Sequence, residues 1–261
     1  MLAASKCDLT RVRSLVNNGV GVNSAGTNGD TLLSYAVESN CIHVVDFLLM
    51  AGAKVNKKAA NGGTSLMTAA LMNNQVLTKR LLRSGAEVDA KDNHGWTALT
   101  IALIHDSNIV IDTLLDSGAD LFVIDSNNDT LLMKAGKNVP TIKLLISKGL
   151  DVNLKNNGGF TALYYANPEA IGLLIEAGAK VDERDNQRKT PLIWACVSGQ
   201  IDRVKKLIAL GADANAKDSD GKSVMDHALT PEETDVVIPK ENRDEIIALL
   251  RKAGAQKQTS K

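Results

Sequence analysis

The residues from Ala216 to Ser223 come closest to a known chemical motif in this chain of 261 residues. They match a relaxed phosphate loop, in which backbone amides and a lysine hold phosphates and a hydroxyl holds magnesium. The strict motif has glycine where Ala216 stands, and it follows a buried strand. Nucleotide binding is therefore one hypothesis for this chain, and an ordinary repeat loop is the alternative that we favour.

Metal and nucleophile chemistry has less support in the sequence. Asp218 and Asp220 hint at calcium, but the alternating carboxylates and the distant glutamate of a calcium loop are missing. No serine or cysteine lies in a nucleophile-elbow sequence. The histidines have no metal-ligand spacing such as H-E-x-x-H. These histidines are His43, His94, His105 and His227. We therefore predict a protein without enzymatic activity and without a cofactor.

A repeat in the sequence predicts the secondary-structure elements on which any functional site would lie. One alanine recurs along the chain, and five of its seven intervals are 33 residues. A fixed period of that length is the signature of a repeat solenoid, in which each unit buries its apolar face only against its neighbours. The recurring alanines are Ala3, Ala36, Ala69, Ala102, Ala135, Ala166, Ala195 and Ala228.

Local signals at fixed places in each unit predict two helices. A threonine or serine stands five residues before most of these alanines, as Thr31 and Thr97 do, and its oxygen can cap the first turn of a helix. Apolar pairs such as Leu48-Leu49 come later and are followed by a glycine, here Gly52, which ends a helix in the left-handed conformation. Each unit therefore reads as helix, short turn, helix and then a polar loop, whose natural conformation is a hairpin turn.

These residues resemble the ankyrin-repeat family. Thr190-Pro191-Leu192 is similar to the family's T-P-L-H helix start, although the histidine is replaced in every repeat, for example by Ser34 and Asp226. The resemblance implies an all-α ankyrin-repeat solenoid of about eight helix-turn-helix repeats with short hairpin loops. The closing residues, Ile246 to Gly254, are similar to the last repeat of stand-alone bacterial ankyrin proteins.

We expect one domain over residues 1–255, followed by a polar tail at 256–261. Residues 1–26 form an incomplete first repeat, and Met1 falls where a helix should already be under way. Either the chain caps itself poorly or an upstream segment such as a signal peptide is missing. The internal repeats are 27–59, 60–92, 93–125, 126–156, 157–185 and 186–218, and the C-terminal repeat is 219–255.

Three repeats depart from the common length. The alanine spacing falls to 31 and then 29 residues in repeats five and six, where Val139-Pro140 and Asn167-Pro168 stand between the helices. Proline there predicts a shortened first helix and a local change in curvature. The last repeat carries an insertion around Thr230 to Asp235, which we read as a solvated loop.

Composition narrows the partners. The chain has 30 basic and 30 acidic residues, so it lacks the basic excess of a nucleic-acid-binding protein. No long apolar run is present, and we expect no membrane insertion. We expect a cytoplasmic location, with secretion or the periplasm as the alternative if an N-terminal signal has been removed. Cys7 and Cys41 could form a bridge between adjacent repeats, but we expect Cys7, Cys41 and Cys196 to be free thiols.

Aromatic residues gather in two elements of the repeat. Six of the eight fall in the hairpin loop or the first helix, the elements that the resemblance places on a concave partner-binding surface. Tyr35, Tyr165 and Trp194 directly precede the recurring alanine, so they could instead pack between repeats. We predict a contact surface centred on repeats three to six. Its residues are Tyr35, Leu71, Met72, Trp96, Ile104, His105, Phe160, Tyr164, Tyr165 and Trp194.

The resulting hypothesis is a protein-interaction module that binds a folded protein through its concave face. A second hypothesis is an inhibitor or immunity protein that occludes an enzyme or toxin. A third, a nucleotide-binding protein or enzyme, depends on the loop from Ala216 to Ser223 and predicts a thermal shift with ATP and magnesium.

Overall fold

The computed structural model of the chain describes residues 1–229 and 238–255. Within these ranges the chain forms sixteen α-helices and no strand beyond two isolated bridges, and the all-α helix-turn-helix prediction is confirmed. The helices belong to two compact units, Met1–Ser126 and Asn127–Lys261. The insertion predicted around Thr230 to Asp235 and the tail at 256–261 lie outside the described residues, and the single domain over 1–255 stays a prediction.

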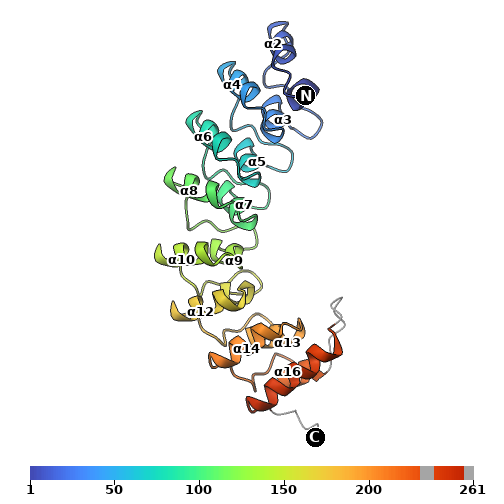
Figure 1. Cartoon of the computed structure of the whole chain (residues 1–261), viewed down its shortest axis with the longest axis vertical. Coiled ribbons are helices and arrows are strands. Elements are labelled where there is room, and N and C mark those ends of the chain that lie inside the picture. The colour runs from blue at the N-terminus through green and yellow to red at the C-terminus, as the bar shows by residue number, and fades with distance from the viewer. Residues whose placement is uncertain (230–237, 256–261) are drawn as a thin grey trace. The chain divides into compact units, whose positions relative to one another are not determined.

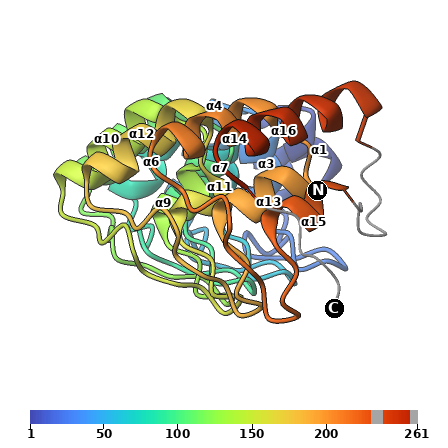
Figure 2. The same ribbon diagram turned by 90° about the horizontal axis from the view of Figure 1, so that it is seen from below.

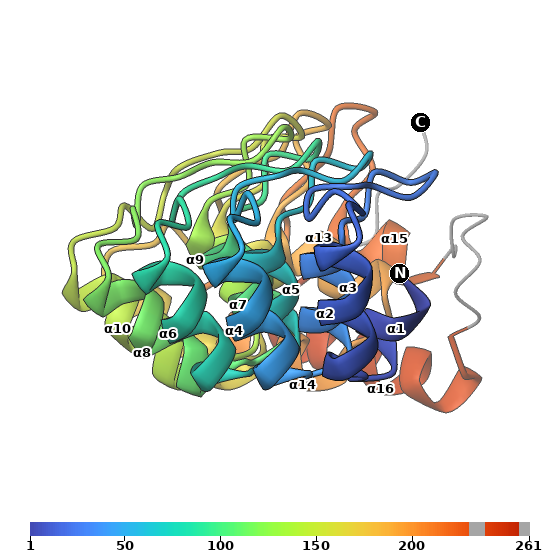
Figure 3. The same cartoon turned by 90° about the horizontal axis from the view of Figure 1, so that it is seen from above.

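The unit Met1–Ser126 contains four helix pairs, which Figure 3 shows as two rows of helices with the hairpin loops beside the first row. Within each pair the first helix packs on the second, and the first helices of neighbouring pairs also pack on one another. The helices are α1 (Leu2–Ser5), α2 (Leu9–Asn17), α3 (Leu32–Glu38), α4 (Ile42–Met50), α5 (Ser65–Leu71), α6 (Gln75–Arg83), α7 (Ala98–Ile104) and α8 (Asn108–Asp116).

The unit Asn127–Lys261 repeats this arrangement (Figure 1). Figure 2 shows α10, α12, α14 and α16 in one row, with α9, α11, α13 and α15 between that row and the hairpin loops. The helices are α9 (Leu131–Ala135), α10 (Val139–Ser147), α11 (Ala162–Tyr165), α12 (Pro168–Glu176), α13 (Pro191–Val197), α14 (Ile201–Ala209), α15 (Val224–Leu229) and α16 (Lys240–Lys252).

Threonine caps begin most of the first helices, as the sequence predicts, although Thr161 makes no side-chain cap bond at the start of α11. The side chains of Thr31 and Thr97 accept hydrogen bonds from the amides of Ser34 and Thr100. The Ser34 and Thr100 hydroxyls in turn accept from the amides of their threonines, which completes a capping box at each helix. The position that holds histidine in the family motif therefore stabilises the start of its own helix in this chain.

Glycines end the second helices and shape the hairpins. Gly52 and Gly118 follow α4 and α8 with φ of +85° and +83°, a conformation that glycine adopts without strain. Gly62, at the hairpin tip, also has positive φ, and a Cβ there would lie 2.7 Å from the backbone nitrogen of Asn93. Hairpins of neighbouring repeats are joined through backbone hydrogen bonds such as Asn93 N–H to Asn61 O at 3.0 Å.

The core lies between the helices of adjacent repeats. The recurring alanines Ala36, Ala69, Ala102 and Ala195 are fully buried, as are Leu48, Leu81 and Leu114 of the second helices. A small side chain in the first helix lets the next repeat approach closely, and the leucines fill the remaining space. This packing explains the fixed positions of both residue types in the sequence.

Two sets of side chains connect neighbouring repeats within each unit. Asn56 donates to the carbonyl of Gly85 at 3.0 Å and accepts from the amide of Glu87 at 2.9 Å. Asn23 and Asn153 make the equivalent pair of bonds in their repeats. In the second set, the side chain of a lysine or an arginine donates to a backbone carbonyl of the next repeat. These bonds are Lys58 to Lys91 O, Lys91 to Ile124 O, Lys155 to Arg184 O and Arg184 to Lys217 O.

Repeats five and six have the short first helices that the spacing predicts. α9 has five residues and α11 has four, against seven in α5, α7 and α13. The predicted role of the prolines is wrong, however. Pro140 and Pro168 lie in the first turns of the second helices α10 and α12, where a missing N–H costs nothing.

The expectation of three free thiols is also wrong. Cys7 and Cys41 form a disulfide with a Cα–Cα distance of 5.1 Å, which links the turns of the first two repeats. Only Cys196 is free among the described residues. It is buried in α13, and this burial raises the pKa of its thiol to about 12.

Candidate functional site

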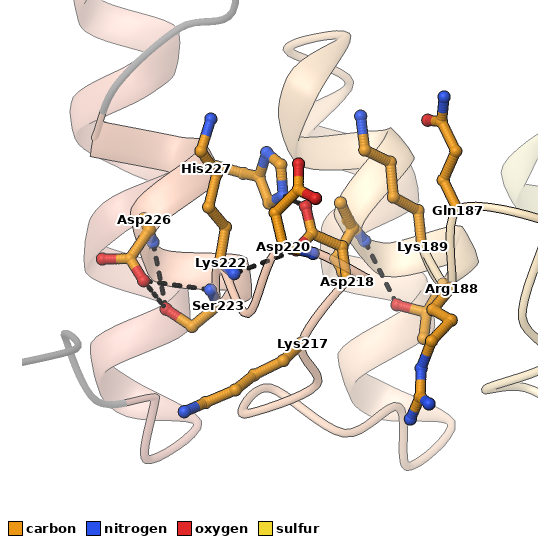
Figure 4. Close-up of polar contacts among 12 residues, drawn as sticks. Gln187, Arg188, Lys189, Lys217, Asp218, Asp220, Lys222, Ser223, Asp226 and His227 are labelled. Carbon is orange, nitrogen blue, oxygen red and sulfur yellow. Dashed lines mark hydrogen bonds and ion pairs between the residues drawn. The ribbon is translucent and has the colours of Figure 1, made fainter.

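The loop that resembles a phosphate loop is an ordinary hairpin (Figure 4). Oδ1 of Asp218 accepts from the amides of Asp220 and Lys222 at 3.0 and 2.9 Å, and its Oδ2 lies 2.8 Å from Nε2 of buried His227. Ser223 caps α15 together with Asp226. Amides that would have to cradle a phosphate therefore bind Asp218 instead, and the structure gives the nucleotide hypothesis no support.

The part of the chain that the structure describes also contains no metal centre of at least three histidine, cysteine, aspartate or glutamate side chains. In the same residues, none of the helices combines the length and the apolar character that crossing a membrane requires.

The same pattern of hairpin hydrogen bonds positions the aromatic residues Trp96 and Phe160. An aspartate or asparagine at the first arm of the hairpin accepts two amides of the second arm. Asp92 does so from His94 and Trp96, both at 2.8 Å, and Asn156 does so from Gly158 and Phe160. The residue that leads into the capping threonine is thereby held in a fixed orientation beside the first helix.

Four of the predicted residues form one cluster in the unit Asn127–Lys261. The ring of Phe160 lies edge-on to Tyr164, Tyr165 and Trp194, with centroid distances of 5.0, 6.2 and 5.7 Å. Rings at such distances and angles attract one another beyond the effect of burial. We call Phe160, Tyr164, Tyr165 and Trp194 the aromatic cluster.

Hydrogen bonds fix the outer members of the aromatic cluster. Nε1 of Trp194 donates to Oδ2 of Asp185 at 2.7 Å, and the ammonium of Lys189 lies 5.0 Å from the centre of the indole ring. The hydroxyl of Tyr165 accepts from the Asn156 amide group at 2.9 Å. These contacts hold each ring in one orientation without covering all of its surface.

Tyr164 supports the aromatic cluster from inside the repeat. It is buried, and its hydroxyl donates toward the carbonyls of Glu183 and Lys189 at 2.6 and 2.7 Å. Burial, followed by the nearby charge of Asp185, raises the pKa of Tyr164 well above its usual value. Tyr164 therefore stays a neutral hydrogen-bond donor at any physiological pH.

The aromatic cluster is half open to solvent. Tyr165 is 38% exposed, and Phe160 and Trp194 are half-buried. The two predicted alternatives, packing between repeats and partner contact, are thus both compatible with this arrangement, because each ring packs on the other rings and keeps part of its surface accessible. A rigid aromatic patch of this kind is the usual centre of a protein interface.

The other six predicted residues lie in the unit Met1–Ser126. Trp96 is half-buried, and its Nε1 donates to Asp125 at 3.1 Å. Tyr35 is half-buried as well. At the turns between paired helices, Leu71 and Met72 are 49% and 39% exposed. In the next repeat the corresponding residues are Ile104, which is half-buried, and His105, which is exposed.

Several exposed apolar residues escaped the sequence analysis, among them Val76, Ile109 and Phe122. Val76 and Ile109 are 49% and 53% exposed, one near the start of α6 and the other near the start of α8. Phe122 is 70% exposed and stands 33 residues after Asp89 and 66 after Asn56, at the position of the inter-repeat asparagine. An aromatic residue at a position that is otherwise asparagine or aspartate is a signal that the sequence does contain.

Comparison with known proteins agrees with the helix-turn-helix repeat. The family model described as "Ankyrin repeats (3 copies)" matches five overlapping segments, residues 1–59, 51–125, 110–185, 132–218 and 167–259. Protein binding is the general role of these repeats.

Several known proteins are similar in sequence to parts of this chain. Protein phosphatase 1 regulatory subunit 27 of Mus musculus is 39% identical over 83 residues, 30% of this chain and 53% of that protein. The Homo sapiens protein of the same name is 42% identical over 67 residues, 24% of this chain and 44% of that protein. Putative palmitoyltransferase ZDHHC13 of Danio rerio is 32% identical over 98 residues, 35% of this chain and 15% of that protein.

The chain therefore spans about half the length of the first of these relatives, and less of the others. They come from eukaryotes, so the expected similarity to stand-alone bacterial ankyrin proteins receives no support from them. The match of the family model extends over residues 1–259. This chain belongs to the ankyrin-repeat family.

Proposed function

We propose that the chain is a non-catalytic protein-interaction module. It binds a folded protein partner through the hairpins and first helices, the elements that form the concave face in this family, with the aromatic cluster at the centre of the contact. The observation that carries the proposal is the half-open arrangement of Phe160, Tyr165 and Trp194, each held by a defined ring contact or hydrogen bond. Rings that are already ordered lose little conformational entropy on binding.

Residues of the unit Met1–Ser126 would also contact the partner. Trp96 occupies the place in its hairpin that Phe160 occupies in repeat six, and Tyr35 precedes the recurring alanine as Tyr165 and Trp194 do. Leu71, Met72, Ile104 and His105 at the helix turns stay part of the proposal.

The test compares the intact chain with two variants in an affinity pull-down from native cell extract. Tyr165→Ser removes the exposed ring, whereas Phe160→Ala would disturb three packed rings at once. Met50→Ser is the matched control, because Met50 is 89% exposed at the end of second helix α4 and lies outside the proposed surface. The proposal expects one protein that is retained by the intact chain and by Met50→Ser but lost by Tyr165→Ser. Equal retention by all three would contradict it.

The runner-up function is inhibition or regulation of an enzyme by occlusion. The observation that favours it is the similarity to two proteins named as regulatory subunits of protein phosphatase 1. It requires that the retained partner be an enzyme whose activity falls in proportion to added chain. A retained enzyme that keeps full activity at equimolar chain would leave scaffolding as the role.

A further inference from the structure

The short first helices of repeats five and six leave a cavity of about 660 Å³ in the unit Asn127–Lys261. Its walls come from the turn between α11 and α12, from the start of α14 and from α16. Because α11 stops at Tyr165, the chain turns into Pro168 earlier than in a repeat of full length. The volume lies within the range of pockets that hold small molecules, roughly 300–1,000 Å³.

Arg203 lines this cavity and completes the truncated helix. Its Nη2 donates to the carbonyls of Leu163 and Tyr164 at 3.2 and 2.8 Å, which α11 is too short to satisfy itself. Its Nη1 donates to the side chain of Gln200 at 3.0 Å. Burial lowers the pKa of Arg203, so the guanidinium has lost hydration that its neutral partners replace only in part.

One of the two carboxylates of the cavity, Glu245, is paired with a cation. Glu245 forms an ion pair with Lys205 at 2.7 Å, and the charge of Asp202 also acts on Lys205. Lys137 and Arg203 line the same cavity, and neither has a carboxylate partner among the described residues. Among the described residues the cavity therefore has three cations against two carboxylates, and Lys137 and Arg203 are the cations that form no ion pair.

Apolar surface accompanies these charges. Tyr165, Ala166, Pro168 and Ile201 contribute to the walls beside Lys137 and Arg203. Such a combination fits a ligand that carries an anionic group on a small carbon skeleton, because the cations would pair with its oxygens and the walls would cover its body.

We propose that this cavity binds a small organic anion through a carboxylate or phosphate group, with Lys137 and Arg203 as the cationic contacts. This anion site is inferred without the protein-binding function proposed above, although Tyr165 belongs to both surfaces. Lys137 is the residue to change, because it is exposed and no bond of its side chain holds the fold together, whereas replacing Arg203 would also release the end of α11.

Isothermal titration calorimetry with the full chain tests the proposal. Succinate and inorganic phosphate serve as separate probes for the two anionic groups, each against sodium chloride at equal ionic strength. Lys137→Gln is compared with Lys148→Gln, which removes an exposed lysine at the opposite end of α10. The expected result is binding of at least one probe, weakened about fivefold or more by Lys137→Gln and unchanged by Lys148→Gln.

Two results would overturn the proposal. If neither probe binds more tightly than chloride, the cavity has no anion site. If both variants weaken binding equally, the binding reflects the overall charge of the protein. The circular dichroism spectra of both variants must match that of the intact chain, so that a loss of binding reports on the cavity and not on the fold.

Discussion

The three cysteines of the chain fall into two classes, a disulfide pair and one buried free thiol. Cys7 and Cys41 are joined, whereas the thiol of Cys196 is buried and its raised pKa of about 12 keeps it protonated. Only a thiolate reacts readily with a disulfide reagent. We expect no reactive thiol in the native protein, one in guanidinium without reductant and three after reduction, as counted with Ellman's reagent. Three thiols in guanidinium alone would show that Cys7 and Cys41 are not bonded.

Glu183 gives a pH dependence whose direction follows from its ion pair. The ammonium of Lys155 lies 2.7 Å from Glu183 and, as the first cause, lowers the pKa of that carboxyl. A lowered folded-state pKa adds stability above the unfolded-state pKa, and this contribution is lost as pH falls through the folded-state value.

Lys155→Met should therefore lower the urea midpoint at pH 7, because it removes the partly exposed ion pair, worth about 0.2–1 kcal/mol, and the hydrogen bond to the Arg184 carbonyl, worth roughly 1 kcal/mol. Only the ion-pair contribution depends on the protonation of Glu183. The difference from the intact chain should shrink as the pH is lowered through the acid range in which Glu183 protonates. A difference that grows toward low pH would contradict the assignment. Lys148→Met controls for the loss of one positive charge.

Residue-scale prediction from the sequence succeeded where a signal is local. Ser223 was assigned to a helix start and the loop before it to a hairpin, and the structure shows both. The sequence allows the pairing of Cys7 with Cys41 but does not predict it. Their spacing of 34 residues places them in adjacent repeats, but whether two sulfurs approach depends on the exact path of both turns.

At the scale of elements, the inter-repeat asparagines stabilise the stack. Asn56 makes two hydrogen bonds to the next repeat. Asn56→Ala should lower the stability by about 1–2 kcal/mol, since each bond contributes roughly 1 kcal/mol. The measurement is urea unfolding followed by circular dichroism, with a lower midpoint expected.

Asn18→Ala is the control for that variant, because Asn18 makes only a 3.4 Å side-chain bond within its own helix region. Equal midpoints for Asn56→Ala and the intact chain would mean that water replaces the two bonds at no cost.

Helix boundaries were predictable because caps and end glycines act within a few residues. The start of α7 at Ala98 follows directly from Thr97, and Gly118 marks the end of α8. The positions of Pro140 and Pro168 in the second helices were not predictable from the sequence. A shortened spacing between alanines does not say which of the two helices lost residues.

The aromatic cluster was predictable from the sequence only in part. Phe160, Tyr164 and Tyr165 belong to one repeat, and Trp194 belongs to the next in the register of Tyr165, so a common location was readable from the sequence. The half-burial of Phe160 and the burial of Tyr164 depend on ring packing and on the positions of the carbonyls of Glu183 and Lys189. Those are tertiary contacts, which the repeat pattern does not specify.

At the scale of the whole molecule, the repeats share the residues that stack them, and they differ in the length of the first helix and in their surfaces. The recurring alanines, caps and hairpin aspartates are engaged within the fold, which leaves exposed rings and charges to distinguish this chain from other ankyrin-repeat proteins. Function in such a chain depends on which partner these surfaces fit.

The most direct test of the protein-binding account is the affinity of the partner recovered in the pull-down, measured by calorimetry against the intact chain, Tyr165→Ser and Met50→Ser. An anchor at the centre of an interface contributes about 2 kcal/mol or more. The account predicts a dissociation constant at least about tenfold higher for Tyr165→Ser and unchanged for Met50→Ser. Equal affinity of all three proteins, with unchanged folding, would contradict it and move the binding surface away from the aromatic cluster.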